Sequence, residues 1–535
     1  MFNFRSFLKL SAVAAAALII ASCGEEKPVL ASKGNMIPDN AMMAVKIDAN
    51  QLFEKALGDQ NSQGRELWNM SKSMLSMSLG EVGEIGNVAR NILKDPATLG
   101  VNMNEPVVMS LSADMSKAML TNEASVDMYF VALLDNKEAF LQVMDATVTF
   151  AEREEGLKVT KDASDKFTHY VFVDETDGSL DLGVSAESVV VRFRYGDNDK
   201  TDLKTSMLGL FANAGPAATG GLDVFYASAG ELTFWYNIEA TMSMVEPMMA
   251  YVDQDTAAQF KQILPMLKGA SMVADLAFLD GQTVLDMKVF GSEEMTELSK
   301  KYYEPASGKF FSYMPGTSVI VGNYYVKNLN EYVKWLSKMD KNYASLFEQL
   351  EYMYGIDERF FEGISGNLTF AIDGNGIDTN EVPGFVFMLE CDRHVWDFMV
   401  SELSEYATYV GSDMYNLMNV AYVSYDNGHV VFADAKTMNA GPLGGSNSFA
   451  ENALAKQIEK GGLTINMETL PYYLLYQFAA EIDRSMTGGE LLEYVSSVTV
   501  STYDNMSGKL VVEMGDKEHN LLEKLVLEAI GSLTF

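Results

Sequence analysis

The chain has 535 residues, of which 48% are hydrophobic and 11% aromatic, and its formal net charge is −35 at pH 7. This content is enough to bury a large core and excludes a largely disordered chain, and the length suggests about two to four domains. A surface this anionic repels phosphate backbones and anionic lipid headgroups, so the charge argues strongly against nucleic acid as a partner.

The N-terminal segment, residues 1–22, has the pattern of a lipoprotein signal peptide. Arg5 and Lys9 form a positive region, an uncharged apolar run covers residues 10–21, and small residues directly precede Cys23. The run is shorter than the roughly 20 residues that a membrane-spanning helix needs. We therefore predict cleavage before Cys23 and attachment to a membrane through lipid on its thiol. The alternative is an ordinary cleaved signal peptide with a coincidental cysteine.

Residues 23–36 are predicted to be a lipidated tether. They contain Pro28, Gly34 and few apolar side chains, as flexible linkers do. Glu25 and Glu26 resemble the acidic signal that sends lipoproteins of Bacteroidota to the outer face of the outer membrane. An equally good interpretation of these acidic residues is a solvated linker. We expect attachment to the outer membrane, with the cell surface favoured over the periplasm.

An internal duplication organises the rest of the chain. The segment Ile37–Val45 reappears as Met314–Gly322, and in both places an amphipathic helix follows an apolar strand. The likeness continues at matching places: 131–140 parallels 387–396, 232–238 parallels 463–469, and each half ends in a hairpin pattern followed by a helix.

We predict two homologous halves, residues 37–304 and 314–535, joined near Pro305–Gly308. Strands outnumber helices and hairpins are common, so we expect an α+β fold with largely antiparallel sheets and interspersed amphipathic helices. In the last helix, Leu521, Leu522, Leu525, Val526 and Ala529 are expected to form the buried face, opposite Glu523, Lys524 and Glu528.

Signatures of catalysis and of cofactor binding are missing from the sequence. The four histidines form no zinc motif, and neither a nucleophile elbow nor a phosphate-binding loop occurs, so we expect no cofactor. The second cysteine, Cys391, has no disulfide partner if Cys23 carries lipid, and its strand-like setting favours a buried thiol. The 74 acidic residues leave a carboxylate-dependent hydrolase open, although no pair stands out.

Three acidic runs are weak candidates for calcium sites. In residues 373–381, Asp373, Asn375 and Asp378 crowd oxygen ligands together, but Ile377 occupies a position where an EF-hand loop needs Asp or Asn. Residues 174–178 and 197–202 look similar. Asp, Asn and Gly between strands are ordinary turn formers, and a turn is the favoured interpretation.

Two kinds of side chain are candidates for binding. The methionines cluster at Met70, Met74 and Met77 and again at Met242, Met244, Met248 and Met249. Methionine stripes on helices usually fill cores, and an adaptable binding groove is the alternative. A glycan-binding protein needs exposed aromatic platforms, for which the candidates are Trp68, Trp235, Trp335 and Trp396.

The lipoprotein signal, the opening segment Ile37–Val45 with its following helix, and the duplicated plan together resemble uncharacterised lipoproteins of Bacteroidota, the domain of unknown function 4836 family. The resemblance implies no activity and no catalytic residues. We predict a non-catalytic cell-envelope lipoprotein that binds an envelope protein, a glycan or another ligand. A structural envelope component is the alternative, and a hydrolase is less favoured.

Overall fold

The computed structural model describes residues 37–38, 40–58, 62–79, 83–114, 125–154, 158–164, 167–173, 178–196, 220–252, 254–339, 341–374, 384–403, 406–468 and 494–533. The predicted signal peptide, Cys23 and the tether lie outside these residues. No helix within the described ranges is long and apolar enough to cross a membrane.

The described elements fall into two series. The first comprises β1 (Met43–Ile47), α2 (Ala49–Leu57), α3 (Gln63–Leu79), α4 (Gly83–Lys94), β2 (Val107–Asp114), β3 (Ser125–Leu133), α6 (Lys137–Glu154), β4 (Lys158–Ala163), β5 (Thr168–Val173), β6 (Gly178–Val184), β7 (Ser188–Gly196), α8 (Leu222–Ala227), β8 (Leu232–Asn237), α9 (Ile238–Val245), α10 (Gln254–Ile263), β9 (Ser271–Leu279), β10 (Gln282–Phe290) and α11 (Glu293–Tyr302). The second comprises β11 (Ser318–Val326), α12 (Leu329–Met339), α13 (Lys341–Tyr354), α14 (Glu358–Glu362), β12 (Ile364–Asp373), β13 (Phe385–Cys391), α15 (Arg393–Leu403), β14 (Ala407–Gly411), β15 (Met414–Leu417), β16 (Ala421–Asp426), β17 (His429–Asp434), α16 (Ala435–Ala440), α17 (Ala453–Ile458), β18 (Gly462–Asn466), β19 (Val495–Asp504), β20 (Ser507–Met514) and α19 (Leu521–Leu533).

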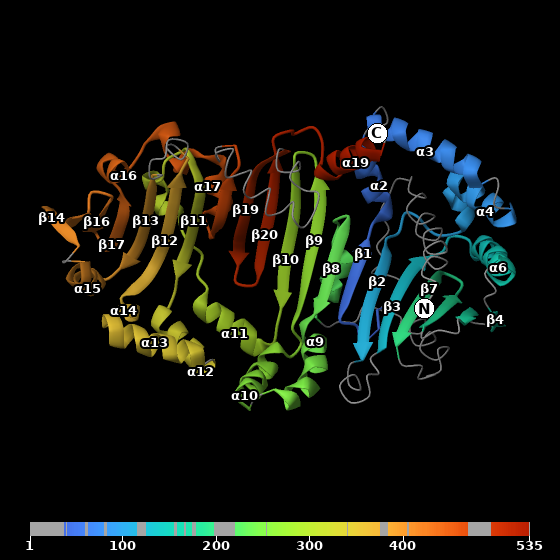
Figure 1. Ribbon diagram of the computed structural model, residues 1–535, viewed down its shortest axis with the longest axis horizontal. Helices are drawn as coiled ribbons and strands as arrows, with labels where there is room; N and C mark the ends of the chain where they lie inside the picture. Colours follow the sequence, from blue (N-terminus) through green and yellow to red (C-terminus); the bar gives the residue numbers. More distant parts are fainter. Residues whose placement is uncertain are drawn as a thin grey trace.

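All of these strands join one antiparallel sheet (Figure 1). Their pairings give the spatial order β4-β5-β6-β7-β3-β2-β1-β8-β9-β10-β20-β19-β18-β11-β12-β13-β17-β16-β15-β14. The predicted α+β class with largely antiparallel strands is confirmed.

The two series run through the sheet in the same order when each is followed outward from the centre. β10 pairs with β20 there, with Leu285 opposite Leu510, and every strand of the first series has a counterpart at the same distance from this junction. The arrangement is that of a pseudo-twofold axis normal to the sheet, which also brings α3 and α13 to opposite corners of the molecule (Figure 1).

The registers correct one detail of the repeat. Ala44 of β1 and Val321 of β11 occupy equivalent positions, and they lie opposite Trp235 and Thr464 respectively. The sequence match instead paired Leu232 with Leu463, two residues out of register. A two-residue slip leaves every side chain on the same face of a strand, so the apolar pattern does not reveal it.

Equivalent residues of β1 and β11 hold the ends of equivalent helices. Lys46 Nζ donates to the carbonyl oxygens of Tyr226 and Ser228 at the end of α8. Asn323 Nδ2 donates to the carbonyl oxygens of Ile458 and Glu459 at the end of α17, at 3.0 Å each. The last carbonyl groups of a helix lack partners within the helix, so these two buried side chains satisfy groups that folding removes from water.

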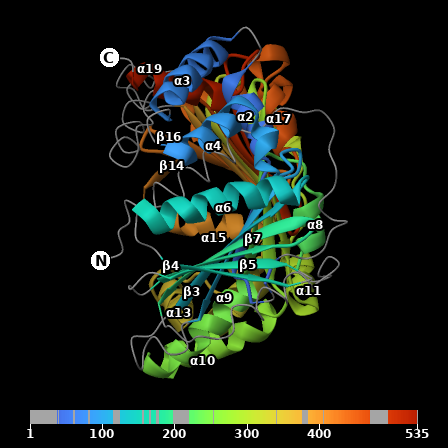
Figure 2. The ribbon, with the colours of Figure 1, turned by 90° about the vertical axis from the view of Figure 1, so that its right-hand side faces the viewer.

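Helices cover the two faces of the sheet unequally. We call the face that carries α8 and α17 the rear face and the opposite one, which carries α6 and α15, the front face (Figure 2). Each half has a rear core, one around Phe225 and Trp235 and one around Phe449 and Ile458. Each half also has a front core at its outer end, where α6 and α15 pack through Phe140 and Trp396.

Two expectations about the second half need adjustment. Phe310 and Phe311 precede the predicted start at residue 314, yet both are buried in its rear core. In α19 the expected polar residue Glu523 is buried, because the helix packs against α2 and α3, and its expected apolar face at Leu521, Leu522, Leu525 and Val526 is half-buried.

Candidate functional site

Of the residues named for the predicted calcium and lipid sites, the structure describes Asp373. Asp373 ends β12, is buried, and its Oδ1 accepts a hydrogen bond from Thr317 Oγ1 at 2.6 Å. Asn375, Asp378 and Cys23 lie outside the described residues, as do 174–177 and 197–202. Within the described part of the chain no group of three or more His, Cys, Asp or Glu side chains is arranged to hold a metal ion.

The four tryptophans do not form a shared platform. Trp235 and Trp396 are buried, and Trp235 Nε1 donates to the Gly220 carbonyl at 2.6 Å. Trp68 and Trp335 are half-buried, but they belong to α3 and α12, which lie apart in Figure 1. Trp335 stacks on Tyr332 with ring centroids 5.7 Å apart. No pair of these tryptophans therefore offers the groove that glycan binding requires.

The first methionine cluster is not core. Met70, Met74 and Met77 of α3 are 61%, 69% and 76% exposed, so the prediction that they fill the interior is wrong. The other side of the helix is half-buried, and there Trp68 packs edge-on against Phe53 with ring centroids 5.2 Å apart. The equivalent helix α13 also exposes apolar side chains, including Leu346 and Met353. In the second cluster, Met242, Met244 and Met249 are half-buried.

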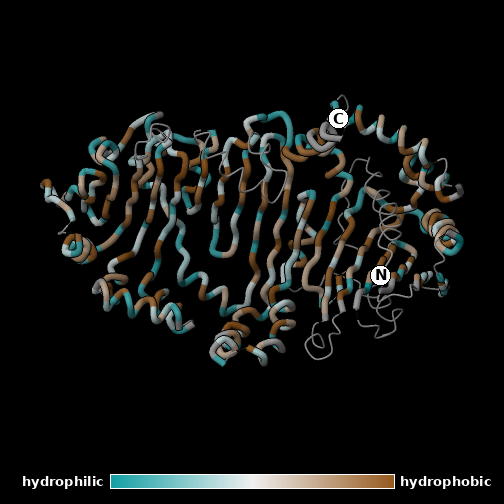
Figure 3. The backbone as a smooth tube through the Cα atoms, in the orientation of Figure 1, coloured by the Kyte–Doolittle hydropathy of each residue, from teal (hydrophilic) through white to brown (hydrophobic). Residues whose placement is uncertain are grey.

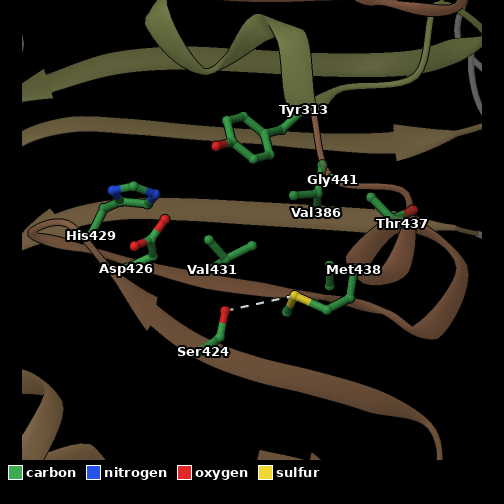
Figure 4. A pocket seen from close by; sticks show the side chains of 10 residues that line it. Tyr313, Val386, Ser424, Asp426, His429, Val431, Thr437, Met438 and Gly441 are labelled. Carbon is green, nitrogen blue, oxygen red and sulfur yellow. Dashed lines mark hydrogen bonds between the residues drawn. The ribbon is translucent and has the colours of Figure 1, made fainter. Parts of the chain in front are cut away.

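A small pocket lies on the rear face of the second half, between β13, β16, β17 and α16 (Figure 4). Its volume is about 110 Å³, which is room for a few water molecules. The lining residues are Tyr313, Val386, Ser424, Asp426, His429, Val431, Ala433, Thr437, Met438 and Gly441.

Two polar side chains of this pocket, Thr437 and Ser424, have partners within the protein. Thr437 Oγ1 donates to Asp434 Oδ2 at 2.6 Å, and Ser424 Oγ lies 3.6 Å from the sulfur of Met438. Burial lowers the pKa of His429, and the Asp426 carboxylate opposes that shift. His429 Nε2 is buried without a hydrogen-bond partner, and the ring packs 5.1 Å from Phe310. The pocket is too small and too apolar to identify a reaction.

An ion cluster occupies the rear face of the first half. Arg192 and Asp181 are fully buried, with Arg192 Nη2 donating to Asp181 Oδ2 at 3.0 Å. His169 Nε2 lies 3.3 Å from the other carboxylate oxygen of Asp181. Burial raises the pKa of Tyr129, which lies opposite Arg192, and the Asp127 carboxylate adds to the rise. These ion pairs explain the cluster as a stabilising part of the core, and it does not mark a binding site.

The front face of the six central strands is the most extensive candidate surface. The strands are β8, β9, β10, β20, β19 and β18, and we call this surface the central front face. Six aliphatic side chains on it lie directly opposite one another, one per strand, and we call them the aliphatic row: Leu232, Leu276, Leu285, Leu510, Val500 and Leu463.

Most side chains of the central front face remain partly open to solvent, whereas Ala274, Phe278, Thr283 and Met514 are buried. Phe234 is 36% exposed. Within the aliphatic row, Val500 is 43% exposed and the other five members are half-buried. The registers place charged residues of the same strands on the rear face: Asp275, Asp286, Lys288, Lys509 and Glu513. Hydrophilic and hydrophobic residues alternate along these strands (Figure 3). The apolar side of a one-sided sheet is ordinarily the covered side, and here the helices of the described ranges leave part of it uncovered.

Among the described residues, the carboxyl groups with a shifted pKa give the hydrolase hypothesis no support. A catalytic acid needs a raised pKa. The carboxyl groups whose pKa departs from its ordinary value are all shifted downward by hydrogen bonds or ion pairs, namely those of Glu331, Asp357, Asp413 and Asp516. These four are exposed or half-buried partners of Lys301, Arg359, Arg393 and Lys524.

Comparison with known proteins gave no relative: no protein-family model matches the chain, and neither a curated protein nor a solved structure matches it.

Proposed function

We propose that this chain is a non-catalytic cell-envelope lipoprotein that binds a ligand across its central front face. The observation that carries the proposal is that the apolar face of the central strands, which a sheet ordinarily covers, is left partly open to solvent. Burying them against a ligand gains about 25 cal/mol for each Å² of apolar surface removed from water. The anchor and the resemblance to Bacteroidota lipoproteins remain sequence predictions that place such a binder at the outer membrane.

The anchor is tested by Cys23→Ala. We expect the variant to leave the membrane fraction as a soluble acidic protein, because one lipidated thiol is the proposed attachment. Cell fractionation with immunoblotting measures this, and Ser22→Ala, which keeps the thiol and a small residue before it, is the matched control. Continued retention of the Cys23→Ala chain in the membrane would refute the lipid anchor.

Ligand binding is tested by site-specific photo-cross-linking in the native envelope. A photo-reactive phenylalanine analogue replaces Leu510, which is on the central front face, or its neighbour Lys509, which is on the rear face. We expect adducts from position 510 and none from position 509, because adjacent residues of a strand face opposite sides. Absence of any adduct at 510 would contradict binding on this face.

A structural role is the second candidate, and the edge strand β14 favours it. The edge strand β4 carries Lys158, Lys161 and Asp162, which discourage pairing with another sheet, whereas β14 has no charged residue. Tyr409 and Val410 of β14 are 58% and 51% exposed.

Sedimentation of Cys23→Ala protein over a range of concentrations distinguishes this second candidate. Self-association that Val410→Lys abolishes would favour a structural component built by edge pairing. A monomer at every concentration would remove that candidate and leave ligand binding.

A further inference from the structure

The central front face is chemically uniform. Its described residues at front-facing positions, apart from the irregular ends of β19, are Leu232, Phe234, Tyr236, Met272, Ala274, Leu276, Phe278, Thr283, Leu285, Met287, Val289, Gly508, Leu510, Val512, Met514, Val498, Val500, Thr502, Leu463 and Ile465. None of them is charged. The same six strands carry two lysines and three acidic residues on the rear face, so the absence of charge belongs to the front face rather than to the strands.

Hydrogen-bonding groups are nearly absent from the same face. The hydroxyl-bearing side chains are those of Tyr236, Thr283 and Thr502, and Thr283 is 7% exposed. A protein or glycan brings amide, carbonyl or hydroxyl groups, and each one buried without a partner costs about 1–3 kcal/mol. Protein interfaces meet this demand with roughly one hydrogen bond per 100–200 Å². A hydrocarbon chain makes no such demand, so it is the occupant that this face complements.

The dimensions of the aliphatic row suit a hydrocarbon chain lying across the strands. Neighbouring strands are about 4.8 Å apart, so six strands span about 24 Å between the outermost side chains. One leaflet of a bilayer has a hydrocarbon depth of about 15 Å, half of the roughly 30 Å core. A whole acyl chain therefore fits along the row.

Methionines flank the row. Met272 lies opposite Val289, and Met287 lies opposite Ala274 and Gly508, all at front-facing positions. Unbranched thioether side chains adapt to irregular apolar partners, as a surface that accepts flexible chains requires. The chain as a whole is strongly anionic, which disfavours an anionic headgroup and favours a neutral or zwitterionic one.

We propose that the aliphatic row binds an acyl chain of a zwitterionic membrane phospholipid, laid across the six central strands. This inference rests on the proposed function and names the ligand of the same face. Binding is non-covalent: hydrocarbon leaves the bilayer and covers the row, and the headgroup remains in water.

The test uses the full chain carrying Cys23→Ala, so that no acyl group of its own is present. Phosphatidylcholine vesicles containing a phosphatidylcholine with a diazirine in its acyl chain are the probe, and mass spectrometry locates the adducts after illumination. We expect adducts on residues of the central front face. Adducts confined to other surfaces, or none at all, would overturn the proposal.

Two matched variants decide whether the row is the site. Val500→Gln places an amide at the most exposed position of the row and is expected to lower labelling about tenfold, the effect of one poorly paired polar group. Ser501→Gln makes the same change in the next residue, on the rear face, and should leave labelling unchanged. Equal labelling of the two variants contradicts the proposal, and urea unfolding of both checks that they remain folded. Val500→Thr, nearly isosteric with valine, gives a second reading that does not depend on added bulk.

The cross-linking experiment in the envelope separates this inference from the proposed function. Lipid adducts at position 510 support both. Protein adducts alone at that position overturn the acyl-chain proposal and leave ligand binding intact. Lipid labelling of the Cys23→Ala chain that the lipidated chain loses would assign the row to the protein's own anchor, which also overturns the proposal.

Discussion

Two equivalent regions on the rear face differ in chemistry although the strands that build them are arranged alike. Following the pairings outward from Ala44 gives the positions Ser110, Tyr129, Arg192 and Asp181. The same path from Val321 gives Ala371, Val386, Ala433 and Tyr422. The first path ends in a buried ion cluster, and the second passes the wall of the small pocket.

The difference shows what the shared framework determines. It sets which positions are buried on the rear face, but either an ion pair or small apolar side chains can fill them. In the first half Arg192 and Asp181 compensate the loss of hydration by bonding to each other. In the second half Val386 and Ala433 occupy less space, which leaves the pocket. The front face contrasts with this divergence, because both halves contribute aliphatic side chains to the aliphatic row.

The largest effect is expected from breaking the ion cluster. Asp181→Ala leaves Arg192 buried without its carboxylate partner, and removal of one member of a buried ion pair costs about 3–5 kcal/mol of the free energy of unfolding. Urea denaturation followed by circular dichroism measures it. The control is Tyr422→Ala at the equivalent place, which loses packing and the hydrogen bond from Asn416 Nδ2 but leaves no buried charge unpaired. An equal or smaller loss for Asp181→Ala would mean that the cluster is no more important than its apolar counterpart.

The thiol of Cys391 gives the next largest effect and reports on the second half. Burial raises its pKa to about 11, and the side chain is 5% exposed. At about pH 8 the reactive thiolate is then on the order of 100-fold scarcer than for a free cysteine. We expect Ellman's reagent to react with the folded Cys23→Ala chain at least that much more slowly than with the urea-unfolded chain.

The same reaction shows whether the halves open independently. If the ion cluster stabilises its own half alone, Asp181→Ala leaves the native labelling rate of Cys391 unchanged. Faster labelling in that variant would indicate that the two halves open together. Comparable rates in folded and unfolded protein would contradict the burial of the thiol.

The repeat pattern and the fold class were accessible from the sequence because strands and amphipathic helices have distinct periods. The terminal hairpins, 272–289 and 498–514, are β9–β10 and β19–β20, since alternating apolar residues around a polar turn define a hairpin locally. The two-residue slip at Leu232 and Leu463 was not accessible, because a strand repeats every two residues.

The candidate site was much less accessible. Alternation in β10, with Asp286 and Lys288 against Leu285 and Met287, does predict a sheet with one apolar face. Whether helices cover that face depends on tertiary packing, which local periodicity does not report. The prediction that Met70, Met74 and Met77 fill the core was wrong for the same reason, because a helical stripe of apolar residues has the same spacing whether it faces a core or water.

A smaller effect is expected from filling the pocket. Ala433→Val adds two methyl groups at a buried position on the pocket wall and is expected to raise the free energy of unfolding by about 0.5–1 kcal/mol, as cavity-filling changes do. Ala44→Val makes the same change in the tightly packed rear core of the first half and should destabilise by about 1–3 kcal/mol. Destabilisation by both changes would show that the pocket is not usable space for side chains.

The smallest effect concerns pH and His429. Because burial lowers its pKa in the folded protein, the unfolded chain binds a proton more readily, and stability falls as the pH drops below the ordinary value of about 6.5. The loss levels off below the folded pKa. His429→Gln should therefore flatten the decline in the free energy of unfolding between about pH 7.5 and pH 5, measured by urea denaturation at each pH. His394→Gln, at an exposed position, should keep the decline of the parent chain. An unchanged decline in His429→Gln would mean that titration elsewhere dominates, and the pocket would then have no part in the response to acid.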